Sequence, residues 1–151
     1  MKHVSLFNIL LLILLGSAFT ACKTQSPGTA KRQQLSGKVI IITGASSGLG
    51  RGIALEAGRS KATVVLASRN KAELEKVAEE ITVLGGKALV APTDVSIEAD
   101  IKSLSEQVVD RFGRIDVWIN NAGIAVLGRY WEIPLEDQLR VVNVNLKGVM
   151  S

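Results

Sequence analysis

A glycine-rich turn is the segment of this sequence whose residue types most clearly suggest chemistry. Gly44, Gly48 and Gly50 follow the short apolar run 39–42 and precede a run with helical spacing. Gly44 would permit a tight turn out of a strand, Gly48 a close approach of backbone to a phosphate, and Gly50 close packing of the helix on the sheet. Free N–H groups and a partial positive charge at a helix start attract anions. The turn therefore predicts a site for a pyrophosphate.

Strand-like and helix-like runs alternate around this turn. Four short apolar runs lack polar alternation, which predicts strands buried on both faces: 39–42, 63–67, 88–91 and 117–119. Apolar residues spaced three, four and seven apart predict the helices, which are 48–58, 74–84, 97–112 and 135–149. This alternation predicts an α/β fold with a Rossmann-type, doubly wound parallel sheet of about four βα units. Ligands of such sheets bind outside the carboxyl ends of the strands, where the glycine turn would lie.

The net charge of +4 is concentrated at the start of the chain. Residues 1–38 hold five basic side chains and no acidic one, whereas the remainder holds 13 basic and 14 acidic side chains. A nucleic-acid surface requires clustered Lys and Arg on the folded part, so we predict no nucleic-acid partner. The single cysteine, Cys22, excludes an internal disulfide and a multi-cysteine zinc site. With one histidine, His3, near the start, we predict no metal site.

Four motifs in order make residues 38–151 resemble the short-chain dehydrogenase/reductase family. Residues 43–50 resemble the family's cofactor loop, and Asp94-Val95 follows the third predicted strand, where the family contacts adenine. Residues 120–123 read NNAG at the end of the fourth strand. Residues 145–148 are similar to the motif that carries the family's catalytic asparagine.

The resemblance implies hydride transfer between NAD(P)(H) and a small-molecule carbonyl or alcohol substrate. It implies a catalytic role for Asn145, and for Asn120 a structural role in bonding backbone between strands. It implies cofactor contacts from the first three motifs: Gly44, Ser46, Ser47, Gly48, Leu49, Gly50, Asp94, Val95, Asn121, Ala122 and Gly123. It also implies that the full-length enzyme forms a homo-oligomer.

The end of the second predicted strand indicates which cofactor is preferred. NAD enzymes of this fold place an acidic residue there for the ribose 2′-OH, and NADP enzymes use Arg for the 2′-phosphate. In this chain Ser68 stands where the acid would be, and Arg69 follows. A guanidinium fork pairs well with a phosphate, so we predict a preference for NADP(H) over NAD(H). The alternative is that Arg69 is a solvated surface arginine.

One departure from the family's pattern concerns the end of the first helix. Family members usually have glycine just before the second strand, which ends the helix in a left-handed cap. Ser60-Lys61 occupies that place, with Gly58 nearby. We therefore expect this helix to end differently.

The resemblance also implies a catalytic tyrosine with a lysine four residues later, and a catalytic serine. The single tyrosine, Tyr130, is followed four residues later by Pro134, so the sequence contains no Tyr-x-x-x-Lys. We interpret 38–151 as an NAD(P)-binding domain truncated before the Ser and Tyr-x-x-x-Lys part, and inactive alone. The chain would then be a fragment of a longer enzyme. The alternative is a genuine truncated product that is a non-catalytic nucleotide-binding or scaffold protein.

Residues 1–22 read as a hydrophobic leader that is not part of the fold. The uncharged run 4–21 follows Lys2, and its 18 residues are just long enough for an uncleaved membrane anchor. Residues 19–22 resemble a bacterial lipobox, which makes Cys22 a lipidation candidate and an exported lipoprotein the alternative; a cleaved signal is the third reading. Basic residues after the run favour a membrane-associated protein whose domain faces the cytoplasm. Residues 23–37 are predicted to be a flexible linker.

Overall fold

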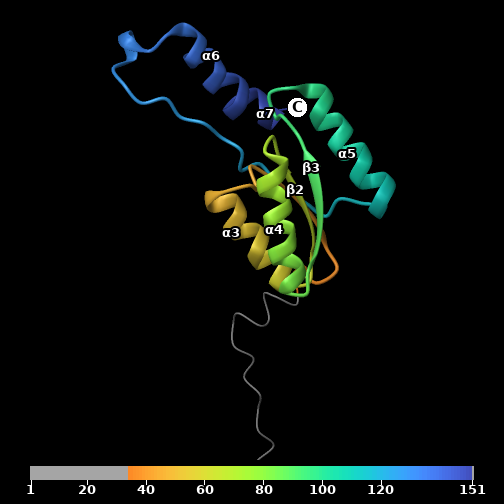
Figure 1. The fold of residues 1–151 in the computed structure, drawn as a ribbon. Helices are drawn as coiled ribbons and strands as arrows, with labels where there is room; N and C mark the ends of the chain where they lie inside the picture. The colour runs from red at the N-terminus through yellow and green to blue at the C-terminus, as the bar shows by residue number, and fades with distance from the viewer. Residues whose placement is uncertain (1–33, 151) are drawn as a thin grey trace, which may run out of the picture.

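A four-stranded parallel sheet forms the centre of the protein (Figure 1). The computed structural model describes residues 34–150. The strands are β1 (Val39–Thr43), β2 (Thr63–Ser68), β3 (Lys87–Pro92) and β4 (Val117–Ile119), and their order across the sheet is β3-β2-β1-β4. Each predicted strand is present, and the predicted parallel, doubly wound sheet is confirmed.

Helices cover both faces of the sheet, which explains why β1 and the middle of β2 carry no polar alternation. The helices α3 (Gly48–Arg59) and α4 (Lys71–Val83) lie side by side on one face, where Ile42 and Leu66 meet their apolar sides. The helix α5 (Glu98–Phe112) packs on the other face through Leu104 and Val108. The strands therefore hold the loops at their carboxyl ends in fixed positions.

The predicted last helix is present but is interrupted by a wider turn. It consists of α6 (Leu135–Val142), a π-helical turn η2 (Asn143–Lys147) and α7 (Gly148–Met150), and a short 3₁₀ turn, η1 (Tyr130–Glu132), precedes it. Single π turns inside helices often occur at functional sites, because they redirect side chains that an α-helix would place elsewhere. Asn145 lies within this π turn.

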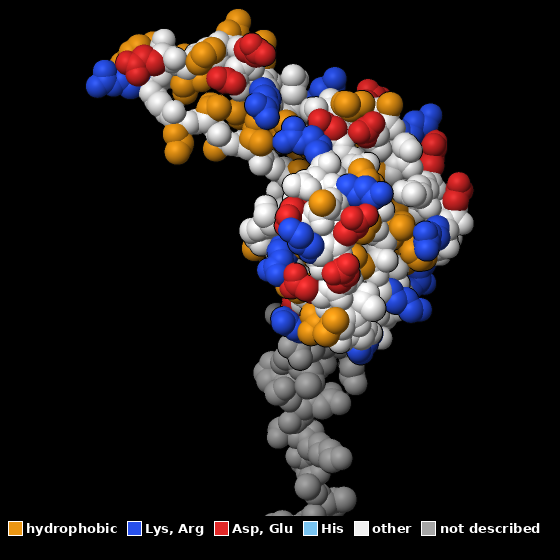
Figure 2. Space-filling model, in the orientation of Figure 1, with side chains coloured by type: hydrophobic (Ala, Val, Ile, Leu, Met, Phe, Trp, Pro, Cys, Tyr) orange, Lys and Arg blue, Asp and Glu red, His pale blue; other side chains and the backbone are white. Residues whose placement is uncertain are grey.

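The end of this helix packs against the sheet domain. Val144 packs in a cluster with Val95 and Ile101, and a Cβ on Gly148 would lie 2.8 Å from the carbonyl oxygen of Val95. The preceding residues, 125–142, form an arm that extends away from the body in Figure 1. Hydrophobic side chains gather on this arm in Figure 2, and the exposed ones are Val126, Leu127, Tyr130, Trp131, Leu135, Leu139 and Val142.

The end of α3 corrects the expectation that this helix would lack a left-handed cap. Lys61 has φ 62°, and it is the one non-glycine residue with positive φ among residues 34–150. The N–H of Ala62 donates to the carbonyl of Ala57 (3.2 Å), and the N–H of Lys61 to that of Gly58 (2.9 Å). These two bonds define a Schellman cap. The cap forms without glycine because the ammonium of Lys61 bonds the carbonyls of Leu84 and Gly85, both at 3.1 Å.

The predicted leader 1–22, with its lipidation candidate Cys22, lies outside the described residues, as does most of the predicted linker. Leu35, near the end of that linker, packs against the cluster under α3 and α4. Among residues 34–150, none of the helices combines the length and the apolar character that crossing a membrane requires.

Candidate nucleotide site

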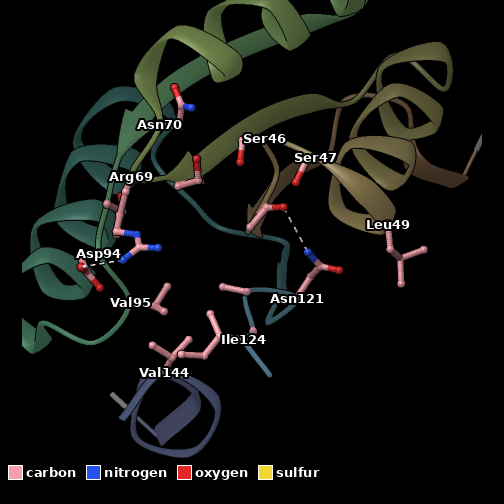
Figure 3. Close-up of a pocket in the computed structure, with 15 residues that line it drawn as sticks. Ser46, Ser47, Leu49, Arg69, Asn70, Asp94, Val95, Asn121, Ile124 and Val144 are labelled. Carbon is pink, nitrogen blue, oxygen red and sulfur yellow. Dashed lines mark hydrogen bonds and ion pairs between the residues drawn. The ribbon is translucent and has the colours of Figure 1, made fainter. Parts of the chain in front are cut away.

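A pocket of about 540 Å³ opens at the carboxyl ends of the strands (Figure 3). It brings together most of the residues predicted for the cofactor: Gly44, Ser46, Ser47, Leu49, Ser68, Arg69, Asp94, Val95, Asn121, Ala122 and Gly123. Three other predicted residues, Gly48, Gly50 and Asn145, do not line it. The pocket lies where a doubly wound sheet binds its ligands.

The glycine turn closes one side of this pocket through very close backbone packing. Gly44 has φ 66°, and a Cβ there would lie 2.8 Å from the Cα of Ala122. A Cβ on Gly50 would overlap the carbonyl of Gly44 and the side-chain amide of Asn121. Gly48 has φ 54° and nothing within 4 Å of where a Cβ would stand. Neighbouring atoms therefore leave no room for a side chain at Gly44 and Gly50, whereas Gly48 leaves open space beside the start of α3.

Thr43 and Asn121 join the end of β1 to the loop after β4. The hydroxyl of Thr43 accepts from the N–H groups of Asn121 and Ala122, both at 3.0 Å. The side-chain amide of Asn121 donates to the carbonyls of Thr43 (3.0 Å) and Gly44 (3.3 Å). Thr43 is buried, so these bonds satisfy groups that water does not reach. They fix the loop that forms the floor of the pocket.

The structural role expected of Asn120 belongs instead to Asn121, so the expectation for Asn120 is wrong. Asn120 is exposed, and its Oδ1 accepts from the indole N–H of Trp118 at 2.9 Å. Side chains two apart along an extended chain point the same way, which places Asn120 beside Trp118. Asn121 points the opposite way, toward β1.

Asn145 acts on the pocket through the loop rather than by lining it. Its Oδ1 accepts from the N–H of Ile124 (2.9 Å), and its Nδ2 donates to the carbonyl of the same residue (2.8 Å). Both polar ends of the side chain are therefore engaged with Ile124, which itself lines the pocket. The π turn places Asn145 against this loop, and its side chain holds the segment 123–124 in position.

Charge in the pocket comes from Arg69 and Asp94, which face each other in Figure 3. Nη1 of Arg69 lies 4.0 Å from Oδ2 of Asp94. The other oxygen of Asp94 accepts from the N–H (2.9 Å) and the hydroxyl (2.7 Å) of Ser96. The hydroxyl of Ser96, followed by its N–H and the guanidinium of Arg69, holds the pKa of Asp94 below its usual value. Asp94 is therefore an anion at neutral pH.

Ser68 contributes a hydroxyl that lacks a partner. Its Oγ is buried in the pocket wall, and no described residue bonds it. Buried polar atoms in native proteins are nearly always hydrogen-bonded, so an orphaned one beside a pocket points to a ligand atom.

Sequence reasoning missed four residues that line the pocket: Asn70, Thr93, Ile124 and Val144. Asn70 had a readable signal, because its side chain caps α4 by accepting from the N–H of Glu73 at 3.2 Å. Thr93 directly precedes the predicted Asp94 at a strand end. Val144 had no local signal, since it reaches the pocket only through the packing of η2 against Val95.

Comparison with known proteins identifies the family to which this chain belongs. Residues 38–151 match the family described as short chain dehydrogenase. An uncharacterized oxidoreductase of Bacillus subtilis, YxnA, is 36% identical over 118 residues, which are 78% of this chain and 33% of that protein. The chain therefore belongs to the short-chain dehydrogenase family.

Two solved structures that are similar to this chain are described as complexes with a nucleotide. The alcohol dehydrogenase of the archaeon Thermococcus sibiricus, complexed with 5-hydroxy-NADP, has a TM-score of 0.73 and 35% identity, covering 76% of this chain and 49% of that one. The 3-ketoacyl-(acyl-carrier-protein) reductase of Brucella melitensis, complexed with NADH, has a TM-score of 0.71 and 41% identity, covering 77% and 47%. The chain spans between a third and a half of the length of the curated relatives it matches.

Proposed function

We propose that this chain provides the nucleotide-binding part of an NADP(H)-dependent oxidoreductase that interconverts a carbonyl and an alcohol. The observation that carries the proposal is the pocket itself. A glycine turn and a helix start stand on one side, and the orphaned hydroxyl of Ser68 stands beside the guanidinium of Arg69 on another. This donor set suits a nucleotide that carries phosphates at two separate places.

The residues present fit such a cofactor. Ser46, Ser47 and the open side of Gly48 would hold the pyrophosphate at the start of α3. Ser68 and Arg69 would hold the 2′-phosphate. The adenine would lie against Asp94 and Val95, and the nicotinamide against the loop 121–123. The bound nicotinamide would supply the hydride acceptor or donor of the reaction.

Asn145 would serve this reaction by positioning. Because both ends of its side chain bond Ile124, it keeps the loop 123–124 at the edge of the nicotinamide side. The sequence has no Tyr-x-x-x-Lys to exchange a proton with substrate oxygen. We therefore expect the 151-residue chain to bind nucleotide without turning over carbonyl substrates, and the catalytic tyrosine and lysine to belong to a longer protein.

Fluorescence titration with NADPH tests the nucleotide site. We expect saturable binding that Arg69→Gln weakens by about tenfold, because a charged hydrogen bond to phosphate is lost. Arg129→Gln is the matched control, since Arg129 is exposed on the arm and pairs with Glu132. An absence of binding would reject the site, and equal binding by both variants would reject the role of Arg69.

The leader supports a separate proposal about location, which rests on the sequence alone. We propose that residues 1–22 tether the protein to a membrane, with the nucleotide-binding domain on the cytoplasmic side. Labelling with a fatty acid, compared between the wild type and Cys22→Ser, separates the two kinds of tether. Label that depends on Cys22 indicates the alternative, an exported lipoprotein, and would reject the cytoplasmic side, whereas membrane association without label indicates an anchor. Recovery in the soluble fraction without label would reject both.

A further inference from the structure

Arg69 and Asp94 form a charge pair that is not a hydrogen bond. Their charged atoms are 4.0 Å apart, and the guanidinium of Arg69 makes no hydrogen bond to any residue between 34 and 150. The side chain of Arg69 is 61% exposed, whereas that of Asp94 is 27% exposed. The N–H groups of the guanidinium are therefore available to a ligand that enters the pocket.

Asp94 is the fixed member of this pair. Its Oδ1 is occupied by the two bonds from Ser96, and its own N–H donates to Oδ2 of Asp100 at 2.9 Å. Its Oδ2 is the oxygen that faces Arg69. An anion in the pocket could thus draw Arg69 toward itself, while the carboxylate of Asp94 would stay in place.

We propose that Asp94 sets how strongly this site prefers a nucleotide with a 2′-phosphate, by competing with that phosphate for Arg69. The inference rests on the proposed function, which assigns the 2′-phosphate to Ser68 and Arg69. A carboxylate beside a guanidinium offsets part of its charge, so the attraction left for a phosphate is smaller. A 2′-hydroxyl is neutral and does not enter this competition. Asp94 therefore reduces the preference of the site for the nucleotide with a 2′-phosphate over the nucleotide with a 2′-hydroxyl.

Calorimetric titration with two nucleotides that lack nicotinamide tests the competition. The probes are adenosine 2′,5′-bisphosphate and adenosine 5′-monophosphate, and the readout is the ratio of their dissociation constants. We expect Asp94→Asn to raise the preference for the bisphosphate about threefold, as for a partly exposed charge pair. Arg69→Gln should lower it. In the Arg69→Gln background Asp94→Asn should leave the ratio unchanged, because the partner is gone.

The controls separate this effect from folding and from net charge. Asparagine keeps an oxygen for the Ser96 donors, and Asp94→Ser is a second variant for which we expect the same direction. Asp110→Asn removes one negative charge from α5 outside the nucleotide pocket, and it should not change the ratio.

Two results would overturn the inference. The ratio could stay the same or fall in Asp94→Asn, as it would if both nucleotides weakened by one common factor, or it could rise equally in the Arg69→Gln background. If Arg69→Gln lowers the preference and Asp94→Asn does not raise it, only this inference fails. If Arg69→Gln has no effect on the ratio, the proposed 2′-phosphate site fails as well.

Discussion

At the scale of single residues, the end of α3 forms a left-handed cap without the glycine that such a cap usually requires. Lys61 takes the left-handed position that glycine would fill at the end of α3. A side chain in that conformation costs about 1 kcal/mol or more. Bonds from its ammonium to the carbonyls of Leu84 and Gly85 offset that cost by joining the end of α3 to the end of α4.

A pair of substitutions isolates the backbone strain at Lys61. Neither Lys61→Gly nor Lys61→Ala has an ammonium, so they differ mainly in tolerance of positive φ. We expect Lys61→Gly to be more stable than Lys61→Ala by about 1 kcal/mol in urea unfolding. At Lys76, inside α4, the order should reverse, because glycine is less favourable than alanine in a helix interior. If Lys61→Ala were as stable as Lys61→Gly, the backbone at position 61 would not be strained.

At the scale of elements, the helix α3 approaches β1 and the loop after β4 more closely than any side chain permits. A Cβ at Gly50 would overlap the carbonyl of Gly44 and the amide of Asn121. That amide in turn holds the end of β1 against the loop. The start of α3, the end of β1 and the loop therefore form one packed unit that shapes the pocket.

Two alanine substitutions in α3 should have opposite effects. Gly50→Ala should destabilise the protein by about 1–3 kcal/mol through overpacking, and it should weaken nucleotide binding. Gly52→Ala has nothing within 4 Å of its new Cβ and should stabilise by about 0.5–1 kcal/mol. Denaturant unfolding measures both. A neutral Gly50→Ala would show that the close approach is not required.

The sequence predicts these elements because their signals are local. The strand β1 and the run Val64 to Ala67 in β2 are buried by both layers of helices, and apolar runs of that kind are readable without a structure. The expectation that 88–91 and 117–119 are also buried on both faces is wrong, because β3 alternates between buried and more exposed residues and β4 is half-buried. The glycine turn and the ends of β2 and β3 are local in the same way. Contacts between distant segments are not readable from spacing. The packing of Val144 on Val95, and the exchange of roles between Asn120 and Asn121, depend on which side of a strand faces its neighbour.

At the scale of the whole molecule, Asp116 joins the first and last strands at the end of the sheet opposite the pocket. Its carboxylate accepts from the N–H of Val39 (2.8 Å) and pairs with Lys38 (3.1 Å) and Arg114 (3.0 Å). Arg114 also donates to the carbonyl of Gly37 at 2.7 Å. The segment before β1 is thereby held against the start of β4.

This cluster predicts how stability depends on pH. The N–H of Val39, followed by Lys38 and Arg114, holds the pKa of Asp116 below its usual value. A carboxyl with a depressed pKa stabilises the fold above its unfolded pKa, near 3.9, and this stabilisation is lost as pH falls through the folded value. Asp116→Asn should therefore flatten the acid limb of a plot of melting temperature against pH. Asp110→Asn is the control, and equal acid limbs in wild type and Asp116→Asn would contradict the assignment.

The central claim is that the pocket at the strand ends binds a nicotinamide nucleotide and prefers the 2′-phosphorylated form. Side-by-side titration of the purified protein with NADP and NAD, at one salt concentration, tests it most directly. We expect saturable binding of both, with a smaller dissociation constant for NADP, because Arg69 and the unpartnered hydroxyl of Ser68 would hold the extra phosphate. Tighter binding of NAD, or binding of neither nucleotide, would contradict it.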